Sequence, residues 1–515
     1  MNENTHRAER VVVIGAGIGG LCSALALSAE GFAVTLIERS NAPGGKMRSV
    51  EAAGLPVDSG PTVFTMKWVF DALFERAGLS FDAAVALDKA DVLARHGWRD
   101  GSALDLFARV DDTVAAVDAF AGAENAEGYR RFAQDSQRVF ETLRDTYIAA
   151  ARPNPVDLVR RVGPLNVGDL LGMKPFSTLW NALGSYFPDS RLQQLFGRYA
   201  TYCGSSPFQA PATLMLVAHV EQDGVWLVQG GMHALAKALA DAARGLGATI
   251  RYGEDVARIE AGRGGVEGVV LASGERIAAE RVVFNGDASA LHRMMSGGKA
   301  PKPVPAAARS LSALTWSMRA KTGGFPLSRH TVFFSDAYRA EFDTIFQGRG
   351  LPEQPTVYIC AQDRDDAGGL SAAGQDGERL LCLINAPADG DTRRFTKSEI
   401  DEWFMKTRDH LAVCGLELEP QEAHATEPAD FEALFPGSGG ALYGRASHGW
   451  MASFQRQGSR TAIPGLYLAG GSVHPGPGVP MAALSGRLSA ESLVADRASM
   501  PRFRPAGTSG GISTG

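Results

Sequence analysis

The sequence predicts an α/β protein that binds a dinucleotide on a parallel β-sheet and carries a second region of mixed helices and strands. Near the amino terminus, the β-branched run Arg10–Ile14 leads into the glycine motif Gly15–Gly20, and a helix pattern and a second apolar run follow. Between residues 465 and 493, a strand pattern, a Gly/Pro-rich turn and a helix pattern occur in the same order. Strands that alternate with helices in this way form parallel sheets.

Length and composition fit a multidomain globular protein and exclude several other classes. The 515 residues include 51 basic and 57 acidic side chains, and the net charge of −6 argues against nucleic acid as a partner. Hydrophobic residues make up 45% of the chain, so it can bury a large core. The five cysteines are scattered without a CxxC pair, which predicts no metal site, no disulfide framework and a reducing compartment.

Neither a signal peptide nor a transmembrane helix is predicted. Residues 1–9 are polar, and the first apolar run carries the glycine motif where a signal peptide would carry a cleavage site. Two stretches without Asp, Glu, Lys or Arg, 199–220 and 461–486, are interrupted by proline and glycine. We expect the Gly-, Ser- and Pro-rich residues 498–515 to form a disordered tail.

The amino-terminal motif supplies the parts that a dinucleotide site needs. Gly15 permits a tight turn, Gly17 lets the backbone approach a pyrophosphate, and Gly20 lets the helix pack closely on the strand. The helix amino terminus offers free N–H groups and the positive end of its dipole to the phosphates. The second strand, Ala33–Ile37, ends at Glu38, whose carboxylate can accept hydrogen bonds from ribose hydroxyls and disfavours NADP. This is the Rossmann βαβ fingerprint in its required context.

Further segments extend the predicted cofactor site. The loop Asn41–Arg48 contains a glycine pair and two cations, which suits contact with a diphosphate, and Val57–Pro61 follows it. Residues 465–481 form a strand and a rigid Gly/Pro loop that ends at a helix amino terminus, a second cradle for phosphate or flavin. His474 in this loop is either a catalytic base or a structural residue, and we favour the structural interpretation.

These segments resemble the flavin-dependent amine oxidase and phytoene desaturase superfamily, in which a glycine pair and a basic residue precede Asp-x-Gly-Pro. The resemblance implies a Rossmann-type FAD-binding domain, and an α+β substrate domain with a sheet roofed by helices. Two residues depart from the usual pattern, since Lys46 stands where arginine is usual and Ser472 where many members have aspartate. The FAD contacts expected from fingerprint and resemblance are Gly15, Gly17, Gly20, Glu38, Gly45, Lys46, Met47, Arg48, Val256, Gly471, Ser472, Gly478, Val479, Pro480 and Met481.

The same reading divides the chain into two discontinuous domains. The predicted FAD-binding domain comprises residues 1–75, 225–295 and 455–497. The predicted substrate and membrane-facing domain comprises residues 76–224 and 296–454. In the latter, the alternating run Leu311–Met318 predicts a sheet strand, and the aromatic-rich segment Met173–Phe187 suits either a bilayer interface or the core.

Residues 44–62 and 196–208 resemble one branch of the carotenoid desaturases, the hydroxyneurosporene or methoxyneurosporene dehydrogenases of purple phototrophic bacteria. The resemblance implies an enzyme that introduces a C3–C4 double bond into acyclic 1-hydroxy or 1-methoxy carotenoids such as 1-hydroxyneurosporene. It also implies an apolar carotenoid substrate, oxygen or a quinone as electron acceptor, and peripheral attachment to the cytoplasmic side of the inner or intracytoplasmic membrane.

Three alternatives share most of these motifs: a phytoene desaturase, a flavin-dependent carotenoid cis–trans isomerase, and a non-enzymatic prenyl-lipid escort protein. The intact glycine motif disfavours the escort protein. No Ser/His/Asp order, HExxH or nucleophile elbow occurs, and the sequence identifies no catalytic acid or base. The candidates for contact with a substrate hydroxyl are Tyr202, Thr315, Ser317 and His330.

Overall fold

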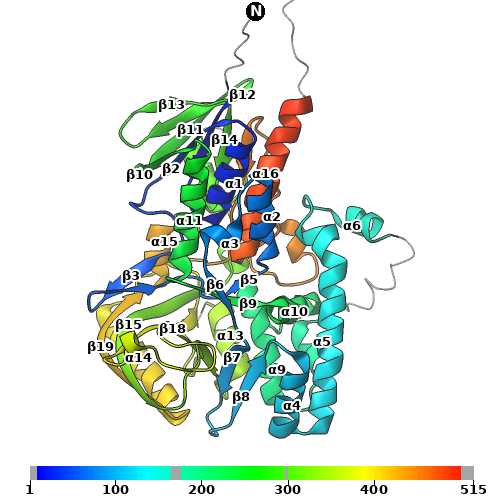
Figure 1. The fold of residues 1–515 in the computed structure, drawn as a ribbon, viewed down its shortest axis with the longest axis vertical. Helices are drawn as coiled ribbons and strands as arrows, with labels where there is room; N and C mark the ends of the chain where they lie inside the picture. Colours follow the sequence, from blue (N-terminus) through cyan, green and yellow to red (C-terminus); the bar gives the residue numbers. More distant parts are fainter. Residues whose placement is uncertain (1–7, 164–175, 296–299, 349, 500–515) are drawn as a thin grey trace, which may run out of the picture.

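The computed structural model describes residues 8–163, 176–295, 300–348 and 350–499. A five-stranded sheet with its helices forms the upper part of Figure 1, and a seven-stranded sheet with further helices forms the lower part. The last helix runs to Ser499, so residues 500–515 of the predicted tail lie outside the described residues.

The upper sheet is parallel throughout, with the strand order β10-β2-β1-β14-β20. The valine-rich β1 is covered on both faces, because Val11 and Val13 pack into the core that contains α1, whereas Val12 and Ile14 pack into the core that contains β11 and β12. The strands are β1 (Arg10–Ile14), β2 (Ala33–Glu38), β10 (Thr249–Tyr252), β14 (Arg281–Phe284) and β20 (Leu466–Leu468).

Three helices cover one face of this sheet, with α1 packed between the other two (Figure 1). They are α1 (Ile18–Ala29), α11 (Met232–Gly245) and α16 (Val479–Ser499). Gly31 follows α1 with φ +79°, a conformation that favours glycine and ends the helix as predicted. A three-stranded antiparallel sheet packs on the other face, formed by β11 (Val256–Gly262), β12 (Gly265–Leu271) and β13 (Arg276–Ala278).

The lower sheet has the strand order β19-β15-β18-β17-β16-β7-β8. Leu314, Trp316 and Met318 share one face of β15, as the alternating run predicts, and belong to the core cluster that helix α14 (Lys397–Val413) covers. The strands are β7 (Val92–Gly97), β8 (Ala103–Phe107), β15 (Ser312–Gly324), β16 (His330–Phe333), β17 (Val357–Ala361), β18 (Glu378–Ala386) and β19 (Leu416–Thr426).

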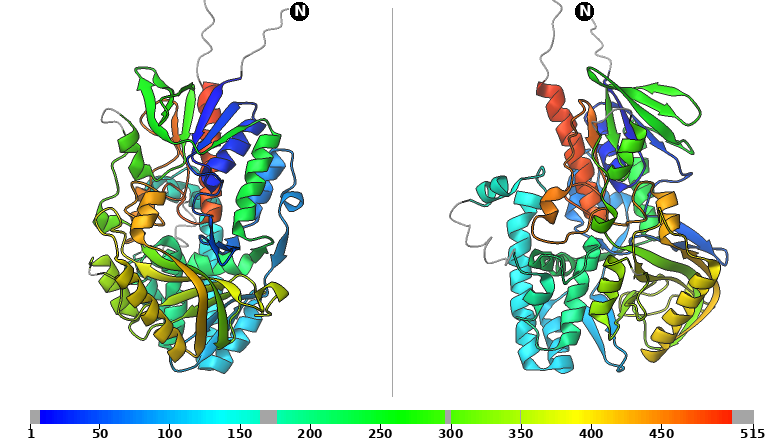
Figure 2. Two further views of the ribbon diagram at one scale, coloured as in Figure 1. Left: turned by 90° about the vertical axis from the view of Figure 1, so that its left-hand side faces the viewer. Right: turned by 180° about the vertical axis from the view of Figure 1, so that it is seen from behind.

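The opposite face of this sheet is turned towards a group of helices, so that α14 and the long helix α5 stand on opposite sides (Figure 2). The helices on this second side are α4 (Val110–Ala121), α5 (Ala123–Leu143), α6 (Pro155–Val162), α8 (Leu179–Leu183), α9 (Ser190–Gly197), α10 (Leu216–Asp223) and α13 (Tyr338–Phe346), with a π-helical turn at Arg144–Ile148 and 3₁₀ turns at Arg198–Cys203 (η3) and Ala212–Met215.

Short elements connect the two parts. The hairpin β3–β4 comes from the predicted FAD-binding segment 1–75 and contacts β15 and β18 of the lower sheet. The domain boundaries therefore stay a prediction, because the hydrophobic core also continues from one part into the other. These elements are β3 (Ser49–Ala52), β4 (Leu55–Asp58), β5 (Phe64–Thr65), β6 (Leu87–Lys89), β9 (Val225–Val228), α2 (Trp68–Arg76), α3 (Phe81–Ala84), α12 (Leu291–Met294) and α15 (Pro428–Leu434).

The aromatic segment predicted at Met173–Phe187 is only partly helical. Met173 lies outside the described residues, and the helix that follows is the five-residue α8. Phe187 is fully buried, whereas Phe176 is 73% exposed. The core interpretation applies to Phe187, whereas contact of Phe176 with a bilayer interface stays a prediction. Among the residues that the structure describes, no helix is both long enough and apolar enough to cross a bilayer.

Candidate functional site

A cavity of about 1280 Å³ extends from the glycine loops of the upper sheet to the inner face of the lower sheet. The fold brings together residues from separate segments of the chain, since every predicted FAD contact except Gly20 lines this cavity. The predicted FAD contacts that line the cavity are Gly15, Gly17, Glu38, Gly45, Lys46, Met47, Arg48, Val256, Gly471, Ser472, Gly478, Val479, Pro480 and Met481.

The first glycine loop is packed so closely that it excludes side chains. A Cβ atom at Gly20 would lie 2.1 Å from the carbonyl oxygen of Gly15, so Gly20 permits the helix to approach the strand without itself lining the cavity. Gly17 is the N-cap of α1, and no side chain caps this helix end. The N–H groups of the first turn are therefore available to a phosphate.

Glu38 lies at the end of β2 and is only 7% exposed. One carboxylate oxygen accepts a hydrogen bond from the N–H of Ala16 at 2.7 Å, and the other accepts one from the N–H of Ser40 at 2.8 Å. Each carboxylate oxygen can accept a second hydrogen bond. Glu38 therefore fixes the glycine loop, a role that the sequence did not predict, and retains capacity to bind ribose hydroxyls.

The second glycine loop lies directly against the first. The N–H of Gly44 donates to the carbonyl oxygen of Ala16 at 2.8 Å, and a Cβ atom at Gly45 would lie 3.2 Å from the Cα of Gly17. The aspartate of the Asp-x-Gly-Pro motif has a structural position, because the Asp58 carboxylate accepts the N–H of Met232 at 2.6 Å and caps α11. The two loops together form one continuous wall of backbone.

The two cations of this loop line the cavity, and residues 426–442 contact both of them. The Lys46 ammonium donates to the carbonyl oxygen of Leu442, and the Arg48 guanidinium donates to the hydroxyl of Thr426 at 3.0 Å. Burial lowers the pKa of Lys46, and the Asp287 carboxylate partly opposes this shift. Their existing contacts hold both cations in the wall, where their remaining donors can meet a diphosphate.

The carboxy-terminal loop closes the cavity from the other side. Ser472, which stands where the resembling proteins often have aspartate, accepts a hydrogen bond from the N–H of Ala288 at 3.1 Å through its hydroxyl oxygen. The N–H of Gly470 donates to the Ser485 hydroxyl at 2.7 Å, and this bond ties the loop to α16. Because α16 begins at Val479, its amino terminus lies on the cavity wall as predicted from the sequence.

His474 in the same loop has the environment of a structural residue. It is 2% exposed and is not part of the cavity wall. Its Nε2 atom lies 3.0 Å from the carbonyl oxygen of Ala150, and its ring lies 4.9 Å from the Tyr147 ring. Burial lowers the pKa of His474 to about 4. These observations support the structural interpretation of this histidine.

Sequence reasoning did not identify Asn285 and Arg456, which lie beside the glycine loops and the carboxy-terminal loop. The Asn285 amide donates to the carbonyl oxygen of Gly15 at 3.2 Å. Arg456 is 4% exposed, lines the cavity and donates to the carbonyl oxygens of Tyr443 and Arg445 at 3.0 and 2.6 Å. The position of Asn285 at the carboxyl end of a predicted central strand could have revealed it, since ligands bind at that edge of a parallel sheet. No comparable sequence signal marks Arg456.

The part of the cavity next to the lower sheet is mainly apolar. Its hydroxyl-contact candidates fall into two groups, because Tyr202 and Thr315 line the cavity, whereas Ser317 and His330 do not. The Ser317 hydroxyl is hydrogen-bonded to Ser59, and His330 is hydrogen-bonded to Tyr358 at 2.8 Å. The apolar residues include Leu143, Ile148, Leu214, Leu216, Val217, Val220, Leu381 and Leu383.

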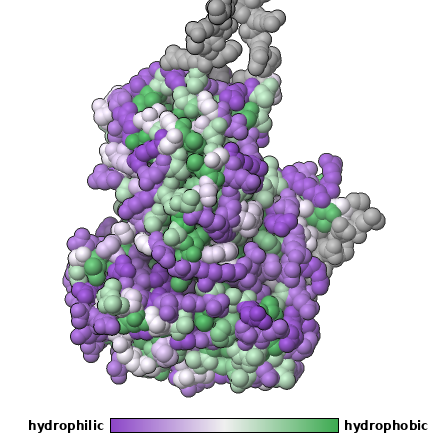
Figure 3. All heavy atoms as spheres, in the orientation of Figure 1, coloured by the Kyte–Doolittle hydropathy of each residue, from purple (hydrophilic) through white to green (hydrophobic). Residues whose placement is uncertain are grey.

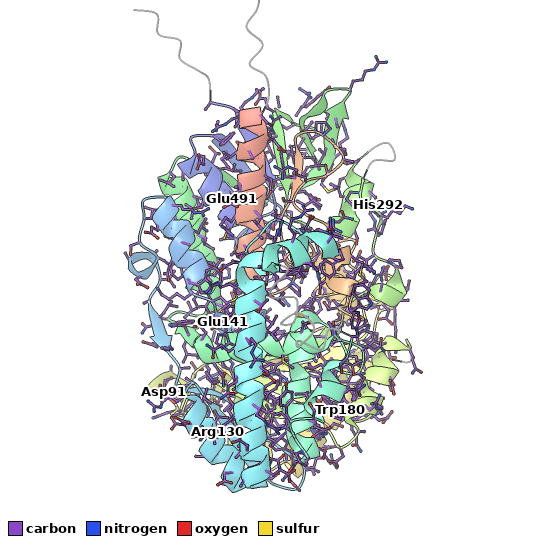
Figure 4. All side chains as sticks on the ribbon, turned by 90° about the vertical axis from the view of Figure 1, so that its right-hand side faces the viewer. Asp91, Arg130, Glu141, Trp180, His292 and Glu491 are labelled. Carbon is purple, nitrogen blue, oxygen red and sulfur yellow. The ribbon has the colours of Figure 1, made fainter. Side chains whose placement is uncertain are left out.

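The cavity reaches the surface beside α6, where apolar residues are exposed. Val159 on α6, Phe176 and Trp450 all line the cavity, and they are 43%, 73% and 48% exposed. The rings of Phe176 and Trp450 contact each other with centroids 5.5 Å apart. We call Val159, Phe176 and Trp450 the cavity mouth. Apolar atoms are visible at the place of α6 in Figure 3, and Figure 4 shows α6 turning away from the upper end of α5.

The model of the flavin-containing amine oxidoreductase family matches residues 18–494. The chain belongs to this family. It is therefore a flavin-dependent oxidoreductase, and the family predicted from the motifs is confirmed. Solved structures agree with the fold, including wild-type putrescine oxidase (TM-score 0.60, 13% identity, 96% of this chain and 99% of the other). A Methanosarcina mazei oxidoreductase gives a TM-score of 0.58 at 15% identity, over 94% of this chain and 100% of the other.

Curated relatives in this flavin family are similar over nearly their whole length. A hydroxyneurosporene desaturase of Rubrivivax gelatinosus is 52% identical, over 99% of this chain and 97% of the relative. A hydroxyneurosporene desaturase of Cereibacter sphaeroides is 44% identical, over 96% and 99%. A 1-hydroxycarotenoid 3,4-desaturase of a Flavobacterium species is 28% identical, over 94% and 99%. The similarity to carotenoid desaturases predicted from residues 44–62 and 196–208 is thus confirmed.

Proposed function

We propose that this flavin-dependent oxidoreductase uses FAD to introduce a C3–C4 double bond into acyclic carotenoids that carry a 1-hydroxy or 1-methoxy group. The observation that carries the proposal is the continuous cavity, which joins a dinucleotide cradle to a long apolar chamber. The similarity to hydroxyneurosporene desaturases supports the choice of carotenoid.

The residues of the cradle fit FAD. The two glycine loops leave no room for side chains where a diphosphate would approach α1. Glu38 would bind ribose, Val256 on β11 would lie against adenine, and Ser472 with the amino terminus of α16 would hold the flavin end. All these groups line the same cavity, which suits a dinucleotide that spans from Glu38 to the carboxy-terminal loop.

FAD, when bound, supplies the two-electron acceptor that a desaturation requires. The residues of the chain would orient the carotenoid and exclude water from it. Leu381, Leu383 and Val217 offer apolar surface, and burying a polyene against such surface stabilises the complex by about 25 cal/mol per Å². The conjugated polyene itself can spread positive charge that develops as hydrogen leaves, so the reaction does not require a strong protein base.

The cavity mouth supports peripheral attachment to a membrane. A carotenoid resides in the bilayer, and Phe176 and Trp450 present aromatic surface at the place where the cavity opens. Aromatic side chains are favoured at the interface between lipid and water. We propose that the mouth rests on this interface and that oxygen or a membrane quinone reoxidises the flavin.

Product analysis tests the proposal. The purified holoenzyme is incubated with 1-hydroxyneurosporene, neurosporene and phytoene in separate reactions, and the products are separated and weighed by mass spectrometry. We expect 1-hydroxyneurosporene to lose two hydrogen atoms, neurosporene to do so at a much lower rate, and phytoene to remain unchanged. Conversion of phytoene would indicate a phytoene desaturase, and a product of unchanged mass would indicate an isomerase. A protein without flavin absorbance that converts nothing would indicate an escort protein.

A further inference from the structure

A half-buried cation lies in the apolar chamber. Arg198, the first residue of η3, lines the cavity, and its guanidinium lies 5.3 Å from the ring centroid of Tyr202 and 5.1 Å from that of Tyr358. The segment that carries it, 196–208, is one of the two that resemble hydroxyneurosporene dehydrogenases. A charged group in an apolar chamber is costly unless it has a partner.

The guanidinium has most of its donors unused. Within the described ranges 8–163, 176–295, 300–348 and 350–499, its one hydrogen bond is from Nη1 to the Tyr202 hydroxyl at 3.3 Å, and it forms no ion pair. A guanidinium has five N–H groups and no acceptor. Arg198 can therefore donate several hydrogen bonds to a ligand in the chamber.

A chain of hydrogen bonds through Tyr202 and Glu221 fixes the position of the Arg198 guanidinium. The Tyr202 hydroxyl donates to the Glu221 carboxylate at 2.8 Å, and the hydroxyl of Tyr199 donates to the other oxygen of Glu221, also at 2.8 Å. Burial raises the pKa of Glu221, and its hydrogen bonds with Tyr202 and Tyr199 oppose that shift. Tyr202 and Glu221 line the cavity, whereas Tyr199 lies behind them. This arrangement positions the cation without neutralising it by direct contact.

Two unpaired hydroxyl groups lie in the same chamber. Thr315 Oγ1 and Tyr338 Oη are buried and have no hydrogen-bond partner among the residues that the structure describes, and both residues line the cavity. Each residue is 4% exposed. Thr315 shares a row across the lower sheet with Leu383 and Tyr358, the residue whose ring Arg198 contacts. Unpaired buried donors are uncommon in proteins and require an explanation, and a polar ligand in the chamber would provide one.

Arg198 lies at the flavin end of the chamber. The Tyr358 hydroxyl is 2.6 Å from the Thr62 hydroxyl, and Thr62 lies two residues from Gly60, where a Cβ atom would meet the carbonyl group of Lys46. On the other side, η3 is followed by Gly204, where a Cβ atom would lie 2.5 Å from the Tyr443 ring. At Gly444, next to Tyr443, a Cβ atom would lie 3.0 Å from Ser472 of the carboxy-terminal loop. The residues around Arg198 are thus linked through packing to the second glycine loop and to the carboxy-terminal loop.

We propose that Arg198, positioned by Tyr202 and Glu221, binds the oxygen atom on C1 of the carotenoid. This inference rests on the proposed function. The oxygen on C1 is only a few bonds from C3 and C4, so its binding site must lie near the flavin end, as Arg198 does. Because a guanidinium only donates, it suits a hydroxyl oxygen and a methyl-ether oxygen alike. A substrate without this oxygen would leave the buried donors unpaired.

The test is the substrate preference of an Arg198→Met variant. Arg198→Met keeps the length and packing of the side chain and removes every donor. The readout is the ratio of kcat/KM for 1-hydroxyneurosporene to kcat/KM for neurosporene, with 1-methoxyneurosporene as a third substrate. We expect the ratio to fall by about 10- to 100-fold, the size of a hydrogen bond to a charged group, with a parallel loss for the methoxy substrate.

The matched control is Arg339→Met, because the Arg339 guanidinium lies 3.8 Å from the Phe208 ring centroid and neither residue lines the cavity, so the ratio should stay unchanged. If Arg198→Met does not retain flavin, Arg198→Lys replaces it, with an expected fall of about 3- to 10-fold because one ammonium replaces the planar fork. An unchanged ratio in the variant that folds would overturn the inference. A wild-type enzyme that does not convert 1-hydroxyneurosporene would instead contradict the proposed function.

Discussion

The side-chain amide of Asn285 donates a hydrogen bond to the carbonyl oxygen of Gly15 at 3.2 Å, which ties the end of β14 to the first turn of the glycine loop. The same amide occupies the space that side chains would need elsewhere in the loop, because a Cβ atom at Gly17 would lie 2.9 Å from Asn285 Nδ2. One polar residue from the centre of the chain thus shapes the amino-terminal loop.

Because of this contact, a Gly17→Ala substitution should affect the stability of the protein and its affinity for FAD separately. We expect Gly17→Ala to lower both the melting temperature and the affinity for FAD, because the new methyl group meets Asn285 and the diphosphate. The double variant Gly17→Ala/Asn285→Ala should recover melting temperature but not FAD affinity. Gly245→Ala, at an open position, is the control. Full recovery of FAD affinity in the double variant would show that Gly17 does not approach the diphosphate.

The carboxylate of Glu38 should contribute to both the loop and the cofactor. In Glu38→Ala, the N–H groups of Ala16 and Ser40 lose the carboxylate that accepts their hydrogen bonds. The ribose hydroxyls of FAD would lose the same charged acceptor. We expect FAD binding to weaken by about 1.5–3 kcal/mol. Fluorescence titration of FAD into the apoprotein measures this change. An unchanged dissociation constant would remove Glu38 from the cofactor site.

Much of the cofactor cradle could be predicted from the sequence, because its signals are local. The strand Arg10–Ile14, the turn at Gly15 and the acid Glu38 follow one another within one βαβ unit. The turn residues and the helix start are marked by residues close in sequence, so the chain pattern reports them, although the contact with Asn285 is not local.

The substrate chamber could not be predicted in the same way, because its polar residues come together through tertiary packing. Arg198 and Glu221 are 23 positions apart and are linked through the Tyr202 hydroxyl. Tyr358, whose ring contacts Arg198, lies on β17 of the lower sheet. Ser317 was a reasonable candidate by its place on the cavity side of β15, yet the nearby Ser59 hydroxyl is its partner. Pairings of this kind carry no periodic signal.

Buried histidines should make the protein sensitive to acid. The pKa of His474 is about 4 in the folded protein, because of burial, and about 6.5 in an unfolded chain. Between these values the unfolded state binds more protons, so stability is full above about pH 6.5 and is lost as pH falls through this window. We expect His474 to account for about 3 kcal/mol of lost stability at pH 4 relative to pH 7.

Urea unfolding at several pH values measures this effect. His474→Gln should show a smaller fall in the free energy of unfolding between pH 7 and pH 4 than the wild type, whatever its stability at pH 7. The matched control is His424→Gln, since His424 is 46% exposed. An identical pH dependence in His474→Gln and the wild type would mean that other groups cause the acid sensitivity.

The aromatic residues of the cavity mouth should control binding to lipid. In Phe176→Ser/Trp450→Ser, two exposed rings are lost, and we expect binding to neutral liposomes to fall at least about tenfold. Met405→Ser on α14 is the control, because Met405 is 51% exposed but lies away from the cavity. Equal loss of liposome binding in both variants would place the membrane contact elsewhere.

The most direct test of the central claim is rapid anaerobic mixing of the oxidised holoenzyme with single carotenoids, with flavin absorbance as the readout. Without an external acceptor, each desaturation must reduce one bound flavin, so bleaching reports the chemical step itself. We expect 1-hydroxyneurosporene to bleach the flavin and phytoene to leave it oxidised. Bleaching by phytoene at an equal or higher rate would contradict the account.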